Sequence, residues 1–398
     1  MENHSFNIPQ LGKNNSLYDE FILFFLITLI INPIYVIIIL GLYNLNRKIE
    51  LKILFIWAIS YSTLLINRKY FIRFSESSND DTITYIPHII SLKNINFFDA
   101  FKLENMTGIE PFSQFFWWVS QFFNIPINLV LFTQVCLWVI GIVILSNSIS
   151  KRYSATLVLF SIGLFPALIP YAFFHQYRQS WAMFFVCISL AHYRISLINR
   201  LKILYLTSHL STLIIWFFDL LINFLKKISL LKILFILFLI FILYSLIINS
   251  LIFRFNKYFF ESQNQIENNG MAIKSIIGII SISIFYKYCE QTIRHKIIYF
   301  TSIIVLLISF FPIFESFSNR LISLIIPIML IVIAPIRNMK LITILALFST
   351  FQLINYLLIK DNLYSFTIGS LSPKLILPFY DFFHFIFFGN DLFENYLN

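Results

Sequence analysis

Charged residues are scarce in this chain of 398 residues, where Asp, Glu, Lys and Arg together make up only 12%. Soluble domains carry about 25%. Hydrophobic residues account for 59% of the sequence, and its mean hydropathy is +0.81. The apolar residues gather in runs near the ~20 residues that a bilayer-spanning helix needs. The composition therefore excludes a soluble protein and predicts an all-α polytopic membrane protein with about 11–12 membrane-embedded helices.

Cysteine is scarce as well, with 3 residues in the whole chain. Cys136, Cys187 and Cys289 are far apart, so they indicate neither a disulfide framework nor a metal site. The sequence also lacks a glycine-rich phosphate loop and a metal-binding spacing of Cys and His. It has no DxD-type metal site of the kind found in nucleotide-sugar enzymes. We therefore expect no metal and no other cofactor.

Lys and Arg concentrate in short loops between the apolar runs and give a net charge of +10. Basic loops of this kind lie on the cytoplasmic side and set the orientation of a membrane protein, so the charge does not imply nucleic acid. No block between the runs is long enough to fold by itself. We expect residues 1–398 to form a single integral-membrane domain.

The expected spans alternate with these basic loops. They are Phe21–Leu42, Ile53–Ile66, Ile127–Leu145, Ala155–Phe173, Trp181–His192, Ile233–Phe253, Met271–Tyr286, Ile297–Phe314, Leu321–Pro335 and Leu341–Ile359. Residues 201–225 form either one further crossing or two half-helices that meet near His209, and the second arrangement keeps the following lysines inside. Pro166 and Pro170 predict a break at the outer end of the fourth span.

One long segment without a span, residues 67–126, falls on the extracytoplasmic side in this topology. From Glu110 to Phe123 it is rich in aromatic residues, which favour the headgroup level of a bilayer. Pro111 suits the first position of a helix. We expect this part of the segment to be a helix lying in the membrane interface.

A short polar stretch, residues 174–181, interrupts the apolar sequence with His175, Tyr177 and Arg178. An arginine at membrane depth costs about 2.5–3.5 kcal/mol on insertion scales, so it faces a polar cavity or extends to the interface. We expect Arg178 to hold an anionic lipid-linked substrate. The alternative is an arginine that only reaches the interface.

The predicted topology collects the other unusual polar residues on the same outer side. They are Asp80, Asp81, Tyr85, Glu110, His209, Glu315 and Arg320. Guanidinium groups bind phosphate through two parallel hydrogen bonds, and a carboxylate or imidazole can take a proton from a sugar hydroxyl. The set suits binding of a diphosphate and transfer of the group that it carries.

Simpler interpretations exist for each of these residues. Asp80 and Asp81 either are solvated or cap a helix that runs through Tyr85. Glu315 and Arg320, in an expected polar hinge over residues 315–320, could form a structural pair. His209 could bind a backbone carbonyl that the helix break leaves free.

Several short pieces resemble, in their order along the chain, the EpsG family of polysaccharide-synthesis membrane proteins and the wider Wzy-type O-antigen and capsule polymerases. The pieces are Asn79–Tyr85, Glu110–Phe112, Tyr177–Ala182, His209–Ser211 and Ser318–Leu321. Leu210 stands where family members often carry a more basic residue.

The resemblance implies a GT-C-like glycosyltransferase at the outer (periplasmic) face of the bacterial inner membrane. It would transfer an undecaprenyl-diphosphate-linked oligosaccharide onto a sugar hydroxyl of another lipid-linked repeat unit, in the synthesis of O-antigen lipopolysaccharide, capsule or exopolysaccharide. Its partners would be membrane lipid, a chain-length regulator and a flippase. The alternative is a flippase or transporter of the same lipid-linked units, which should show duplicated halves that this sequence lacks. An assembly partner without catalysis is the third possibility.

In the polymerase interpretation the polar residues divide into two groups. The expected catalytic residues are Arg178, His209, Asp81 and Glu110. The expected substrate-binding residues are Arg320, Asp80, Tyr85, His175, Tyr177 and Glu315.

Overall fold

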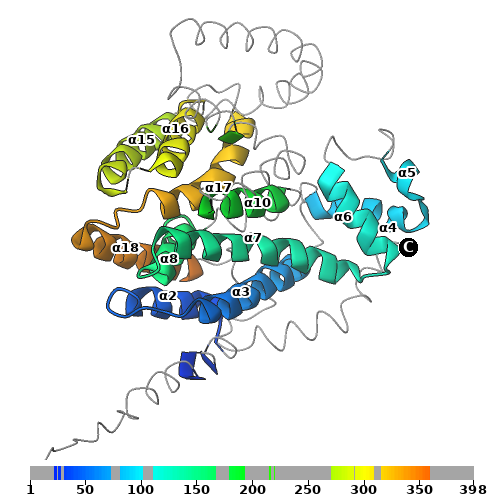
Figure 1. Cartoon of the computed structure of the whole chain (residues 1–398), viewed down its shortest axis with the longest axis horizontal. Coiled ribbons are helices and arrows are strands. Elements are labelled where there is room, and N and C mark those ends of the chain that lie inside the picture. Colours follow the sequence, from blue (N-terminus) through cyan, green and yellow to red (C-terminus); the bar gives the residue numbers. More distant parts are fainter. Residues whose placement is uncertain are drawn as a thin grey trace, which may run out of the picture.

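The computed structural model describes residues 22–24, 26–27, 31–72, 81–101, 111–166, 179–192, 215–216, 219, 270–290, 292–308 and 315–358. Within these ranges the ordered elements are thirteen helices (Figure 1). They are α2 (Pro33–Tyr43), α3 (Leu51–Ile72), α4 (Asp81–Ser91), η1 (Leu92–Asn94), α5 (Phe97–Ala100), α6 (Pro111–Phe122), α7 (Ile127–Ile149), α8 (Ser154–Gly163), α10 (Gln179–Ala191), α15 (Gly270–Tyr288), α16 (Ile293–Ile308), α17 (Glu315–Val332) and α18 (Met339–Leu358).

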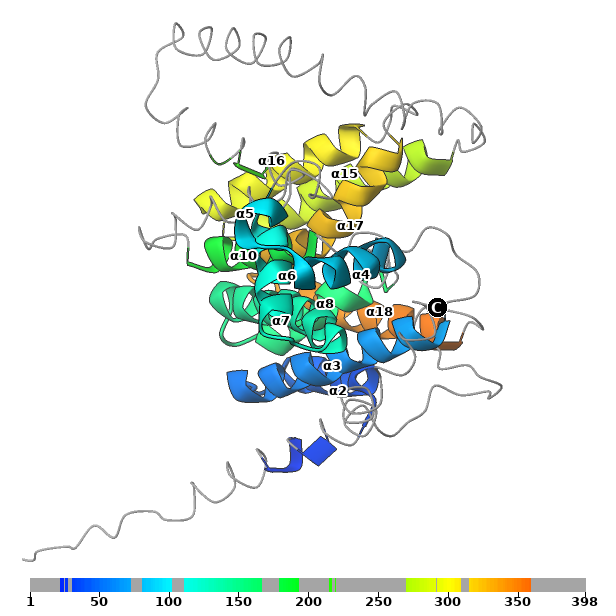
Figure 2. The same cartoon turned by 90° about the vertical axis from the view of Figure 1, so that its right-hand side faces the viewer.

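Helix α7 is the centre of the bundle, because α3, α8, α10 and α17 all pack against it. Figures 1 and 2 show α2 and α3 on one side of α7, and α15, α16 and α17 on the other. The contact between α7 and α10 is close at Gly141. A Cβ atom there would lie 3.1 Å from Cys187 Cβ and 3.3 Å from the Phe184 Cα. Small residues at such crossings let two helix backbones approach each other.

Asn44 joins two turns at one end of the bundle. Its Nδ2 donates hydrogen bonds to the backbone oxygens of Arg152 (2.8 Å) and Arg47 (2.9 Å). Its Oδ1 accepts from the backbone N–H groups of Ala155 (2.9 Å) and Thr156 (3.2 Å). The Asn44 side chain is fully buried. It therefore accepts hydrogen bonds from free N–H groups at the start of α8, although Asn44 itself directly follows α2.

The turns that carry the basic residues meet at this same end. Arg294 Nη2 donates to the Ser148 backbone oxygen at 3.3 Å, and the Arg337 backbone N–H donates to the Tyr288 oxygen at 3.4 Å. The Tyr153 hydroxyl donates to Met339 Sδ at 3.3 Å. These bonds connect the turns at residues 44–50, 150–153, 289–292 and 333–338. We call this the basic end of the bundle.

At the other end, α4, η1, α5 and α6 form a cap beyond the first residues of α7 (Figure 1). In Figure 2 the cap faces the viewer, with the bundle behind it. The cap contains the described part of the predicted extracytoplasmic segment. It therefore lies away from the basic turns, as the predicted topology requires.

Two described helical segments, Leu129–Ile149 and Met339–Leu357, are long and apolar enough to cross a membrane. The second exposes an apolar stripe at helical spacing, formed by Ile344, Leu347, Phe348, Phe351 and Ile354. Contiguous exposed apolar surface marks contact with a membrane or a partner. These features agree with a membrane protein.

The prediction of one helix over Phe21–Leu42 is wrong. Asn32 has non-helical backbone angles (φ −49°, ψ 125°), and α2 begins at Pro33. The Asn32 side chain accepts a hydrogen bond from Ile34 N at 3.0 Å. Asparagine is a preferred N-cap and proline a preferred first residue, so this dipeptide starts a new helix inside an apolar run.

Two further boundaries also differ from the prediction. Helix α3 continues to Ile72, so residues 67–72 of the predicted loop are helical. Residues 315–320, predicted as a polar hinge, form the first turns of α17. Glu315 is acidic, and an acidic residue at the start of a helix complements the helix dipole. The polar residues that follow it continue α17 beyond its apolar run.

Two predictions from proline are confirmed. Helix α8 ends at Gly163, ahead of Pro166, because proline disfavours helical continuation. Helix α6 begins at Pro111 and covers the aromatic segment. Most of residues 201–225, including His209, and all of Ile233–Phe253 lie outside the described residues.

Replacing Asn44 with Ala should lower the free energy of unfolding by about 1–3 kcal/mol, because the buried backbone groups of two turns lose their partner. Thermal unfolding of the detergent-solubilised protein measures this change. Asn46→Ala, at an exposed position of the same turn, should change stability by less than about 0.5 kcal/mol. Equal effects of the two substitutions would contradict the role given to Asn44.

Candidate functional site

The first turns of α6 and α10 are held together by aromatic rings. The Trp181 ring lies edge-on to Phe112 and Phe116, with centroid separations of 5.4 and 4.5 Å. Phe185, one turn further along α10, contacts Phe112 at 4.9 Å. Trp181 is buried, and such ring pairs stabilise a contact by about 0.5–1.5 kcal/mol each beyond their buried area. The N-terminal ends of α6 and α10 are therefore fixed side by side.

Both helix ends directly follow predicted catalytic residues in the sequence. Glu110 immediately precedes α6, and Arg178 immediately precedes α10. Six of the candidate residues lie outside the described residues, namely Asp80, Glu110, His175, Tyr177, Arg178 and His209.

The other four candidates lie in described helices. Asp81 is the first residue of α4, so a helix does run through Tyr85, as one of the two simpler interpretations required. Glu315 and Arg320 lie in the first half of α17, whose other end reaches the basic end. The side chains of Asp81, Glu315 and Arg320 lie outside the description, so their roles stay predictions.

Tyr85 is the one candidate whose side chain is described, and its ring packs against α6 within the cap. Its buried ring is 5.5 Å from the ring of Trp117 on α6. Trp117 Nε1 in turn donates a hydrogen bond to Oε1 of Gln134 on α7 at 3.2 Å. A chain of contacts therefore runs from the cap helix α4 through α6 to the central helix of the bundle.

A second polar connection holds the cap helices to one another. His88 Nε2 and Gln114 Oε1 are 2.9 Å apart, and Gln114 Nε2 donates to the backbone oxygen of Ala100 at 2.8 Å. Because the amide oxygen is an acceptor, His88 Nε2 carries the proton in this arrangement. The edge of the His88 ring also contacts Trp117 at 5.9 Å. These bonds join α4, α5 and α6.

Several buried polar atoms at the junction of α6, α7 and α10 have no hydrogen-bond partner among the described residues. They are Ser113 Oγ, Gln121 Nε2, Gln134 Nε2 and Trp181 Nε1. Buried polar groups in folded proteins are normally paired. Most of these are N–H donors, which suit the oxygen atoms of a sugar or a phosphate.

The sequence prediction missed His88, Gln114 and Gln134. His88 could have been found, because it lies three residues after Tyr85 and so on the same side of a helix. Gln134 is a polar residue within an apolar run, which was a weaker signal. Gln114 gave no signal, since its partners depend on how the cap folds.

No cluster of three or more His, Cys, Asp or Glu side chains that could bind a metal occurs within the described ranges. Cys136, Cys187 and Cys289 are buried and form no disulfide.

The described residues form a helical bundle with a helical cap, and its two long apolar helices agree with a membrane protein. The family model described as "EpsG family" matches residues 70–379. The chain belongs to the EpsG family, as the sequence resemblance predicted. Membership implies a part in exopolysaccharide biosynthesis. No curated protein and no solved structure matches the chain.

Replacing Trp181 with Ala should destabilise the junction by about 3–5 kcal/mol, the usual loss for a buried large aromatic side chain. Limited proteolysis should then cut the cap faster than in the unmodified protein. Phe122→Ala provides the control, because Phe122 lies on α6 but is 62% exposed. If the two variants are cut at the same rate, Trp181 does not hold the cap to the bundle.

Proposed function

We propose that the protein is a polysaccharide repeat-unit polymerase of the bacterial inner membrane. It transfers a glycan from undecaprenyl diphosphate onto the sugar hydroxyl of another lipid-linked repeat unit. The family match supports the polysaccharide part of this proposal. The geometry at the junction of cap and bundle supports the choice of a transferase.

The observation that carries the proposal is the contact of Trp181 with Phe112 and Phe116. It brings together two helices whose preceding residues are Arg178 and Glu110. A cation and a carboxylate are the pair that the reaction needs. One can hold a diphosphate and the other can accept a proton.

The basic end supports one orientation in the membrane. Lys and Arg residues concentrate in cytoplasmic loops, and the described basic turns meet at the end of the bundle opposite the cap. The junction would then face the periplasm or exterior. Lipid-linked repeat units, rather than cytoplasmic nucleotide sugars, are the donors that suit this side.

In the proposed reaction the acceptor hydroxyl oxygen bonds to the anomeric carbon of the donor sugar. The bond between that carbon and the phosphate oxygen breaks, and undecaprenyl diphosphate leaves with the electron pair. Arg178 and Arg320 neutralise the charge that develops on the diphosphate. Glu110, Asp81 or His209 takes the proton of the acceptor hydroxyl.

The remaining candidates bind the sugars and the phosphates. They are Asp80, Tyr85, His175, Tyr177 and Glu315. The Tyr85 ring on α4 contacts Trp117, and Trp117 Nε1 donates a hydrogen bond to Gln134 Oε1 on α7. The glycan would therefore lie between the cap and the first part of α7.

Replacing Arg178 with Ala should reduce the glycan of the cell to single repeat units, because the leaving diphosphate loses its cation. Loss of one preorganised donor typically lowers a rate by about 100- to 1000-fold. Arg178→Lys should restore little, since a point charge lacks the planar pair of donors. The measurement is the chain-length ladder of the cellular glycan, with the protein level checked in membranes.

Lys93→Ala is the matched control, because it removes an exposed cation from the cap and should leave the ladder normal. A normal ladder from Arg178→Ala would contradict the proposal. A deletion strain distinguishes the alternative function. Unpolymerised units should accumulate on the outer face if the protein is a polymerase, and on the inner face if it is a flippase.

A further inference from the structure

Helix α6 of the cap turns polar side chains inward and aromatic side chains outward. Gln114 and Gln121 are buried, together with Trp117, whereas Phe115 is 45% exposed and Phe122 is 62% exposed. A helix that meets water buries its apolar side and exposes its polar side. The arrangement in α6 is the reverse, and it is the one expected where the surroundings of the outer side are apolar.

The exposed rings of α6 continue onto α5. Phe97 of α5 contacts Phe115 and Trp118, with centroid separations of 6.5 and 5.1 Å, and Trp118 stacks on Phe122 at 5.3 Å. Phe98 is 82% exposed, more than any other large hydrophobic side chain among the described residues. We call this surface the aromatic face. It consists of Phe97, Phe98, Phe115, Trp118, Phe122 and Phe123.

The aromatic face has no hydrogen bond to offer to a ligand. Trp118 Nε1 is the one polar side-chain atom of these six residues, and it already donates to the backbone oxygen of Ile95 at 2.9 Å. A glycan needs partners for its hydroxyl groups, because a polar group that is desolvated without a partner is costly. Hydrocarbon needs none. The face therefore suits acyl chains rather than sugars.

The turn from α6 to α7 holds this face at the end of a membrane-crossing segment. Asn124 has a φ of 53°, and the backbone N–H groups of residues 124 and 125 donate to oxygens of the last turn of α6 at 3.0 and 2.8 Å. These two bonds form a Schellman helix ending, which asparagine accommodates. The apolar segment Leu129–Ile149 of α7 begins a few residues later. Phe122 and Phe123 thus lie where a span would end, the level at which aromatic rings are favoured.

We propose that the aromatic face of α5 and α6 is a lipid-binding surface, inserted into the membrane leaflet at the cap end of the bundle. The rings of Phe98, Phe115 and Phe122 contact the upper parts of the acyl chains, about 5–10 Å into the boundary between headgroups and chains. The sequence predicted an interfacial helix over Glu110–Phe123 alone. The part played by α5 and the inward polar side of α6 come from the tertiary structure.

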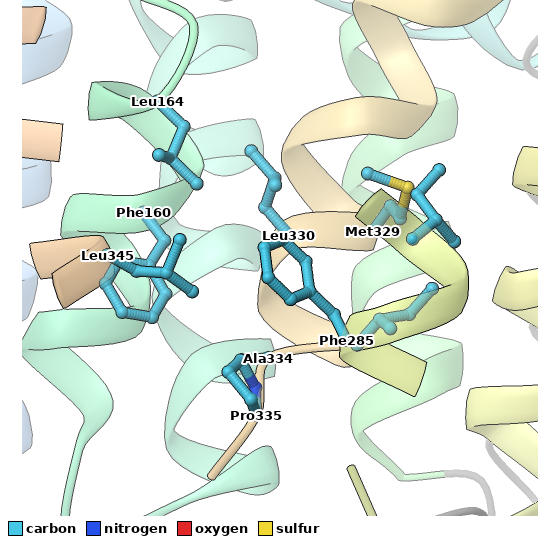
Figure 3. A pocket seen from close by; sticks show the side chains of 10 residues that line it. Phe160, Leu164, Phe285, Met329, Leu330, Ala334, Pro335 and Leu345 are labelled. Atoms are coloured by element: carbon cyan, nitrogen blue, oxygen red, sulfur yellow. The ribbon is translucent and has the colours of Figure 1, made fainter. Parts of the chain in front are cut away.

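Lipid would meet the fold at this outer surface and not in the apolar pocket between α8, α15, α17 and α18. Figure 3 shows Phe160 and Leu345 on one wall of that pocket and Phe285 and Leu330 opposite them. The pocket has a volume of ≈ 10 Å³, about the space that one water molecule needs. An acyl chain does not fit there.

Insertion of the aromatic face would also fix the height of the cap relative to the bilayer. The contacts of Trp181 with Phe112 and Phe116 tie the start of α6 to α10, so the segments that precede both helices would be held at one level. This anchoring does not depend on the reaction that the protein performs. The present proposal and the proposed function can therefore fail separately.

The test uses the full-length protein, one copy per nanodisc of phosphatidylethanolamine and phosphatidylglycerol. Phe98→Cys is labelled with a bimane dye, while the native cysteines are buried. The dye should lose about half of its emission to lipid that carries a nitroxide on the upper acyl chain, because its site lies about 5–10 Å deep. Aqueous iodide should quench it little. Quenching by iodide without quenching by the nitroxide lipid would overturn the proposal and assign the face to water or to another protein.

Asn94→Cys with the same dye is the matched control, because Asn94 is exposed on η1 of the same cap, outside the aromatic face. Its dye should be quenched more by iodide than by the nitroxide lipid. Equal quenching of the two dyes by the nitroxide lipid would mean that the dye itself enters the bilayer, and the assignment of the face would be rejected. Protection of the Phe98→Cys dye from both quenchers would reject it as well, because protein would then cover the face.

A pair of unlabelled variants tests the role of the Phe98 ring directly. In nanodiscs, Phe98→Lys should raise hydrogen exchange of the α5 amides about tenfold, equivalent to about 1.4 kcal/mol, because a charge replaces the inserted ring. Phe98→Leu keeps an apolar side chain and should leave the exchange nearly unchanged. An unchanged rate in Phe98→Lys, or an equal rise in both variants, would contradict insertion of this ring into lipid.

Discussion

The structure depends on the rule that a polar group buried in an apolar bundle must find its partner within the chain. Asn44 shows the rule most clearly. Its side chain satisfies backbone groups of Arg47, Arg152, Ala155 and Thr156, all at the same end of the bundle. Two turns separated by 108 residues are thereby fixed together. The alignment of α2 with α8, and the gathering of the basic turns, follow from this connection.

The same rule has a different outcome at the cap. Trp117, His88 and Gln114 find partners there, but Gln134 Nε2 and Trp181 Nε1 have none among the described residues. An unpaired buried donor costs about 1–3 kcal/mol. The junction of α6, α7 and α10 therefore carries a polar cost that the turn at Asn44 does not.

The two ends of the bundle present different chemistry. The cap end combines aromatic packing with donors for oxygen-rich groups. The basic end carries clustered cations.

The sequence by itself determined the class of protein, the family, most helices and the side on which basic turns gather, because hydropathy, charge and proline act locally. It also determined the start of α6 at Pro111 and the end of α8 ahead of Pro166. It did not determine the break at Asn32 or the helical state of residues 315–320, where local preferences compete. Only the tertiary structure decided that Trp181 contacts Phe112 and that Gln134 receives the Trp117 N–H. Such contacts depend on the relative positions of helices far apart in the chain, which no local pattern encodes.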